Sequence, residues 1–184
     1  MIRDLVFAAL LAVSAGSAAA QESDSPSETA SDVAHPAVEQ LRHVIGEWQV
    51  ATTFYRDDGS VAGTFDGEYQ FDWVMEDKIV KGVSTIPQFE MASGILFYLR
   101  PSSNEIEMVS VGPDGQLWTM TGPQDSETRE TPLVAQADGS TLKLRFTRFN
   151  VTPDRFESRM ERSTDGGESW LLGNTQVFVR KTAA

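Results

Sequence analysis

Apolar and polar residues alternate along most of this chain, and this pattern limits the fold more than any other feature. In residues 67–73 the odd positions are Gly or aromatic, and the even positions are Glu, Gln and Asp. Residues 142–146 and 155–161 alternate in the same way. A period of two is that of a β-strand with one covered face and one wet face. The body of the chain is therefore predicted to be β-sheet.

Turn residues separate the alternating runs at regular intervals. They include Asp57-Asp58-Gly59, Pro113-Asp114-Gly115 and Asp165-Gly166-Gly167. Asp-Gly pairs tolerate the positive φ that tight hairpins require. The spacing predicts about ten strands in an antiparallel sandwich or barrel.

One helix is expected before the first strand. Pro36 suits a first helical turn. Val38, Leu41, Val44 and Ile45 then recur at helical spacing, and Gly46 ends the pattern.

The N-terminus resembles a secretory signal. In residues 1–20 a weakly basic start precedes the apolar run Leu5 to Val13 and the small residues 18–20. The run is short for a membrane span, which needs about 20 apolar residues. We expect cleavage after Ala20 and an exported protein, either periplasmic or secreted, whose mature chain does not span a membrane.

Residues 21–34 differ in composition from the rest of the chain. They contain four acidic residues, no basic residue and no aromatic residue. Such a segment cannot bury enough apolar surface to offset the entropy of ordering it. We expect a disordered acidic linker here and one folded domain over residues 35–184.

Charge and residue counts exclude several functions. Lys and Arg number 15 against 27 Asp and Glu, a net charge of −12, which argues against a nucleic-acid partner. The chain has no Cys, which excludes disulfides, thiol catalysis and thiolate metal sites. Only His35 and His43 are available, and no nucleophile elbow, P-loop or dinucleotide fingerprint is present. We expect no metal site and no cofactor.

The order of these features resembles the calycin superfamily, which includes lipocalins, fatty-acid-binding proteins and nitrobindin-type barrels. A short helix, then Gly46-Glu47-Trp48 opening the first strand, then only antiparallel strands is the shared pattern. The chain is most similar to uncharacterised exported bacterial lipocalin-like barrels, which also have a late Ser-x-Asp-Gly-Gly-x-x-Trp turn and a final strand with Arg. The resemblance covers roughly residues 36–181. It implies an all-β fold, a single antiparallel up-and-down β-barrel of about 8–10 strands with a short N-terminal helix.

The resemblance also implies roles for individual residues. In calycins the Trp of Gly-x-Trp closes one end of the barrel and stacks on an Arg of the last strand; here these would be Trp48 and Arg180. The late turn also resembles the Asp-box of sialidase-type propellers, where the Asp caps backbone amides and the Trp packs beneath. We therefore expect structural roles for a set of six residues: Gly46, Trp48, Asp165, Gly167, Trp170 and Arg180. Nitrobindin-type barrels hold haem through a late His, whereas no His follows His43 here.

An inward apolar stripe is the strongest sign of a ligand. Aromatic and Met residues on the faces predicted to point inward could line a cavity. Arg148 shares the face of Phe146, and an inward Arg needs either an inward acid or a ligand carboxylate as its partner. The residues predicted to bind a ligand are Tyr69, Phe71, Trp73, Tyr98, Trp118, Phe146, Arg148 and Met160.

Three hypotheses for function follow. The first is a cofactor-free barrel, monomeric or homodimeric, that binds a small apolar or amphipathic molecule. It requires a cavity of roughly 300 Å³. The second is an isomerase or cyclase acting on a lipid-like substrate, with an acid, base or Tyr in the cavity; its candidates are Tyr55, Tyr69, Asp72, Tyr98 and Glu161. The third is a cell-envelope interaction module with a packed interior. Whether the chain is an enzyme stays open, with the balance against it.

Overall fold

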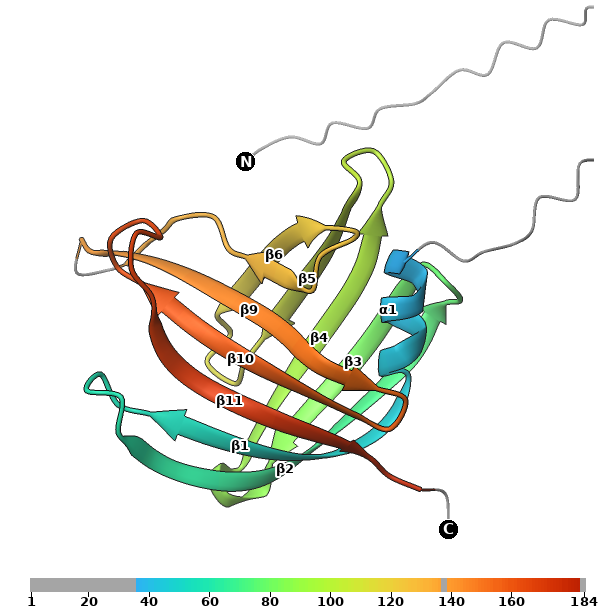
Figure 1. The fold of residues 1–184 in the computed structure, drawn as a ribbon, viewed down its shortest axis with the longest axis horizontal. Helices are drawn as coiled ribbons and strands as arrows, with labels where there is room; N and C mark the ends of the chain where they lie inside the picture. Colours follow the sequence, from blue (N-terminus) through green and yellow to red (C-terminus); the bar gives the residue numbers. More distant parts are fainter. Residues whose placement is uncertain (1–35, 137–138, 183–184) are drawn as a thin grey trace, which may run out of the picture. The chain divides into compact units, whose positions relative to one another are not determined.

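The part of the chain that the structure describes forms one short α-helix and eleven strands, all antiparallel to their neighbours, with a 3-10 helix η1 (Pro87–Phe89) between β3 and β4 (Figure 1). The computed structural model describes residues 36–136 and 139–182. The predicted signal peptide, the predicted linker and His35 lie outside the described residues. The elements are α1 (Pro36–Val44), β1 (Gly46–Tyr55), β2 (Val61–Met75), β3 (Ile79–Ile86), β4 (Met91–Arg100), β5 (Glu105–Val111), β6 (Leu117–Pro123), β7 (Thr128–Glu130), β8 (Val134–Ala135), β9 (Thr141–Thr152), β10 (Arg155–Ser163) and β11 (Leu171–Arg180).

Ten of the strands close into a barrel. The strand order runs from β10 through β11, β1 and on to β7 and β9, and the pairing of β9 with β10 closes the ring. The two-residue β8 pairs with β9 outside the ring. Consecutive strands are neighbours nearly everywhere, so the prediction of an up-and-down barrel with a short N-terminal helix is confirmed.

The core lies inside the barrel and is richest along β1. Trp48 and Val50 are completely buried, and Phe71, Phe156 and Phe178 are nearly so. These residues occupy alternate positions of their strands, as a period of two predicts. The apolar members of the predicted alternation therefore do face the interior.

Helix α1 lies at the end of the barrel where β9 turns into β10. The Arg180 guanidinium donates to the carbonyls of His43 and Ile45 at 2.8 and 2.7 Å, which satisfies two free carbonyls at the end of the helix. The indole Nε1 of Trp48 donates to the carbonyl of Val44 at 2.8 Å. The last turn of α1 is thereby fixed to β1 and β11.

The strand pairing around the barrel is shortest between β6 and β7. These strands share a single residue pair, Thr121 with Glu130. A Cβ atom on Gly122 would lie 2.1 Å from the backbone oxygen of Thr128, so glycine is needed for this close approach. The contact between β6 and β7, called the seam below, thus depends on the pair Thr121–Glu130 and on Gly122.

Within the described part of the chain, α1 is the one α-helix, and no helix there is long and apolar enough to cross a membrane.

Candidate ligand-binding site

The barrel contains a cavity of about 190 Å³ next to α1. Its wall is mostly aromatic and aliphatic, with a few polar groups from α1 and from seven of the strands. The full lining is Gln40, Leu41, Val44, Tyr69, Phe71, Ser84, Ser93, Ile95, Phe97, Met108, Ser110, Arg129, Phe146, Arg148, Phe156, Met160, Gln176 and Phe178. A mainly apolar pocket with a few convergent polar groups is the usual form of a small-molecule site.

The structure brings five of the eight predicted ligand residues together around this cavity. They are Tyr69, Phe71, Phe146, Arg148 and Met160. They come from β2, β9 and β10, strands distant in the sequence that face one interior. That they contact a ligand remains a prediction.

The other three predicted residues do not line the cavity. Tyr98 faces outward, because Ser93, Ile95 and Phe97 are the residues of β4 that line the cavity, and its hydroxyl donates to Glu107 on the neighbouring strand. Trp73 packs against the buried core beyond Phe71. Trp118 shares the face of buried Met120 but is not among the residues that line the cavity.

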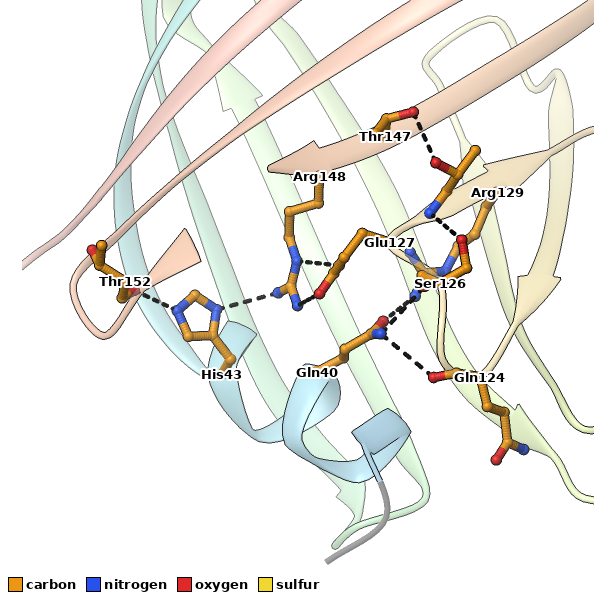
Figure 2. Close-up of polar contacts among 10 residues, drawn as sticks. Gln40, His43, Gln124, Ser126, Glu127, Arg129, Thr147, Arg148 and Thr152 are labelled. Atoms are coloured by element: carbon orange, nitrogen blue, oxygen red, sulfur yellow. Dashed lines mark hydrogen bonds and ion pairs between the residues drawn. The ribbon is translucent and has the colours of Figure 1, made fainter. Parts of the chain in front are cut away.

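Arg148 has an acid as its partner, one of the two possibilities that its inward position implied. Its side chain is 6% exposed, and its Nε and Nη2 atoms donate to the two carboxylate oxygens of Glu127 at 2.7 and 2.9 Å (Figure 2). Two parallel bonds of this kind are among the strongest that a guanidinium makes. The positive charge of Arg148 is therefore matched inside the protein.

Arg129 also lines the cavity, and its surroundings are different. It is 4% exposed, and its Nη2 atom donates to the neutral Gln40 side chain on α1 (Figure 2). Among the described residues, its Nε is the one buried side-chain nitrogen or oxygen without a hydrogen-bond partner. Burial lowers the pKa of Arg129 to about 10.

Gln40 connects Arg129 to the segment that leads into β7. Its Nε2 donates to the carbonyl of Ser126 at 3.2 Å and, more weakly, to that of Gln124 at 3.5 Å (Figure 2). The amide oxygen is left to face Arg129. The side chain of Gln40 is thus held in one orientation by the backbone carbonyls of Gln124 and Ser126.

His43 lies between the arginines and the β9–β10 turn. Its Nδ1 is 3.2 Å from Arg148 Nη1, and its Nε2 is 2.7 Å from the carbonyl of Thr152 (Figure 2). Because a guanidinium can only donate, Nδ1 is the acceptor and the proton lies on Nε2. Burial, reinforced by the charge of Arg148, lowers the pKa of His43, so the imidazole is neutral near pH 7.

A second polar group faces the cavity from β2 and β11. Gln176 Nε2 donates to the Tyr69 hydroxyl at 2.9 Å and to Thr52 at 3.2 Å, and its carbonyl accepts from Ser158 at 3.2 Å. Burial raises the pKa of Tyr69, which therefore stays protonated. The cavity thus offers a hydroxyl on this side and a guanidinium on the α1 side.

Of the five acid–base candidates, only Tyr69 lines the cavity. Asp72 is exposed, and Glu161 pairs with Arg145 at 2.9 Å outside the cavity. The Tyr55 hydroxyl is 3.3 Å from that of Thr175, and Tyr98 faces outward. No Asp or Glu is among the lining residues, so a proton acceptor of this kind is missing from the described cavity wall.

Trp48 and Arg180 make the contact that the resemblance implies. The guanidinium carbon of Arg180 lies 4.2 Å from the centre of the Trp48 ring, and the two residues are paired across β1 and β11. Gly46 precedes this pair with a φ of 115°, a conformation that favours glycine. The group sits at the α1 end of the barrel.

The turn after β10 is held by its own hydrogen bonds. Asp165 accepts from the Ser163 hydroxyl at 2.6 Å and from the Ser169 amide at 3.0 Å, and bonds of this kind hold the pKa of Asp165 well below its usual range. Trp170 donates to the carbonyl of Gly167 at 3.1 Å. Arg145 stacks on Trp170, 4.0 Å from its ring centre. These contacts stabilise a turn and are distant from the cavity.

Sequence reasoning missed six polar residues of the cavity: Gln40, Ser84, Ser93, Ser110, Arg129 and Gln176. Gln176 shares the strand face of Phe178, so alternation could have identified it. Arg129 lies in a three-residue strand within a polar stretch, where no apolar pattern marks the inward face. No group of three His, Asp or Glu that could hold a metal is found among the described residues.

Solved structures with a similar fold have low sequence identity to this chain. Rv2717c from M. tuberculosis matches with a TM-score of 0.52 at 15% identity, covering 80% of this chain and 98% of that one. The S-type phycobiliprotein lyase CPES from Guillardia theta matches with a TM-score of 0.51 at 10% identity, covering 79% and 93%. No protein-family model and no curated protein matches the chain. These similarities support a lipocalin-like barrel, consistent with the calycin resemblance.

Proposed function

We propose that this protein binds a small apolar or amphipathic molecule inside its barrel. The cavity of about 190 Å³ carries this proposal, because it is lined mostly by aromatic and aliphatic side chains and has polar groups on two sides. An apolar cavity of about 150 Å³ is large enough for benzene. A ligand of one or two rings is therefore the natural size.

This size narrows the sequence-based expectation. The sequence-based hypothesis required a cavity of roughly 300 Å³, and the cavity is smaller, at about 190 Å³, so that size requirement is not met. A whole long-chain lipid does not fit in it. Because the interior is not packed solid, the cavity also argues against the interaction-module hypothesis.

Burial of apolar surface would supply most of the affinity. Aromatic ligands bury an area similar to an aromatic side chain, about 150–250 Å². At about 25 cal/mol per Å² this gives roughly 4–6 kcal/mol before the costs of association are subtracted. Moderate affinity is therefore expected from a single ring, with polar contacts adding selectivity.

Native mass spectrometry of the full chain, before and after incubation with indole, tests the proposal. Added mass that is released on denaturation supports an internal ligand site. The variant Ser110→Phe should abolish binding, because Ser110 lines the cavity and a phenyl group would fill it. The control Ser102→Phe, at an exposed turn position, should bind as the wild type does. Equal binding by both variants would contradict an internal site.

We also propose that the protein is exported, on the basis of the apolar run and small residues in 1–20. The full chain produced with its own N-terminus in a Gram-negative bacterium should appear in the periplasm or medium and begin at Gln21. Replacing Ala18 and Ala20 by Leu should block cleavage. A cytoplasmic protein that still begins at Met1 would contradict export.

A further inference from the structure

The charges around the cavity do not balance. Two arginines line it, and no acidic residue does. The Glu127 carboxylate raises the pKa of Arg129 through its charge, but both of its oxygens accept from Arg148. His43 is neutral at pH 7, because burial lowers its pKa. One positive charge is left over at the α1 end of the cavity, in a protein whose net charge is −12.

The unmatched charge belongs to Arg129. No ion pair involves it among the described residues, and its Nε proton has no acceptor there. Its contact with Gln40 is to a neutral amide oxygen. Leaving a buried guanidinium without an anion is costly, and natural proteins pair such groups or use them.

Arg148 provides the internal comparison. It is buried to nearly the same extent, 6% against 4% exposed, and it lines the same cavity. The fold supplies a carboxylate that bridges Arg148 through two hydrogen bonds. Arg129 has donors of the same geometry and no such carboxylate. What differs between the two residues is the missing anion.

We infer that Arg129, oriented by Gln40, binds the carboxylate of an anionic ligand whose apolar body occupies the cavity. The inference rests on the proposed function and adds the chemical class of the ligand, a small aromatic or aliphatic carboxylate. The Nε–H of Arg129 has no acceptor among the described residues, so it is the donor left for a carboxylate oxygen of a ligand in the cavity that Arg129 lines. The aromatic wall then contacts the rest of the ligand.

Benzoate and its neutral isostere benzamide test the inference on the full-length protein by calorimetry or ligand-observed NMR. Benzoate should bind at least tenfold more tightly than benzamide, because only benzoate neutralises Arg129. In Arg129→Gln the affinity for benzoate should fall at least tenfold while that for benzamide stays within twofold. Arg129→Lys, which keeps the charge, should restore part of the preference. Arg159→Gln removes the same charge from an exposed outward position and should change neither affinity.

A measurement on the wild type avoids dependence on any variant's folding. The pKa of ¹³C-carboxyl benzoate, followed by NMR titration, should be lower when bound than when free, because a cation beside the carboxylate favours its charged form. An unchanged or raised pKa, or equal binding of the two probes, would overturn the inference.

The outcomes separate this inference from the proposed function. If indole binds but benzoate does not, the anion site is wrong and the ligand-binding barrel stands. If indole, benzoate and benzamide all fail to bind the folded protein, both proposals are overturned.

Discussion

Two sides of the barrel are built differently. On one side, β1 pairs with β2 from Gly46 to Tyr55 and with β11 from Trp48 to Phe54, and it carries the completely buried Trp48 and Val50. On the other side, β7 has three residues and meets β6 at the one pair Thr121–Glu130. The first side is continuous in both hydrogen bonding and packing, whereas the second contains a buried charge next to a cavity.

This difference indicates that the β1 side provides most of the stability, whereas the β7 side carries the features suited to binding. Burial of large apolar side chains is the main favourable contribution to folding. The β1 side provides it through Trp48, Phe156 and Phe178, whose rings contact one another. That contribution allows the β7 side to retain an unpaired guanidinium and empty space, both of which reduce stability.

Trp48→Ala should have the largest effect, because it removes the centre of the packed side. Trp48 is 0% exposed and stacks edge-on against Phe156 at 4.9 Å between ring centres. Large-to-small changes of this kind cost about 3–5 kcal/mol. Urea denaturation should show this loss in the free energy of unfolding. The matched change Trp118→Ala, at a partly exposed position, should cost clearly less, and equal losses would contradict the comparison.

The packed side was also the part that the sequence predicted best. Alternation of Gly67, Tyr69, Phe71 and Trp73 identifies an inward face because the polar residues between them leave only one choice of face. In Ile95–Leu99 both faces are apolar, so the sequence does not say which one points inward, and Tyr98 was assigned to the cavity although it faces outward. Period-two patterns therefore predict orientation only where the two faces differ in polarity.

The polar end of the cavity was harder to predict for a different reason. Arg148 was recognised because it follows Leu144 and Phe146 on one face, but its partner Glu127 lies 21 residues earlier in a stretch without apolar residues. Arg129 lies in that same stretch. Their positions depend on the closure of β7 onto β9, which is a tertiary contact that no local pattern encodes.

Gly122→Ala should have the next largest effect by opening the seam between β6 and β7. The added Cβ would meet the backbone oxygen of Thr128 at 2.1 Å, so the strands must move apart. Such overpacking costs about 1–3 kcal/mol. Hydrogen exchange should accelerate at the amides of 128–130, with those of β1 little changed. Gly94→Ala is the control, since its Cβ would meet only the Val111 side chain at 3.4 Å, and it should change neither quantity.

The two buried arginines should respond in opposite directions when their surroundings are changed. In Glu127→Gln, Arg148 loses the carboxylate that matches its charge, and we expect a loss of about 1–2 kcal/mol, less than for a fully buried pair because Glu127 is 35% exposed. In Arg129→Gln, an unpaired buried charge is removed, and the ligand-free protein should be at least as stable as the wild type. Urea denaturation of refolded, ligand-free protein measures both.

The sign of the Arg129 effect is the informative part of this comparison. Replacing a residue that stabilises the fold lowers the free energy of unfolding of the protein. Replacing a binding residue that the fold tolerates at a cost does not lower it. A loss of more than about 1 kcal/mol in Arg129→Gln would mean that its bond to Gln40 outweighs the cost of burying the charge. In that case Arg129 would be structural in the same sense as Arg148.

The smallest expected effect is the pH response of His43, which links α1 to this polar end. Burial lowers the pKa of the folded imidazole below its ordinary value of about 6.5, so the unfolded chain binds the proton more readily. Stability from this group is therefore complete above about pH 6.5 and is lost as the pH falls through the folded pKa. Protonation would also place a proton on Nδ1, which now accepts from Arg148 at 3.2 Å. Between pH 7.5 and 5.5 the free energy of unfolding of the wild type should decrease more than that of His43→Gln, which cannot titrate. Equal decreases in the two proteins would show that the contact between α1 and Arg148 does not depend on a neutral imidazole.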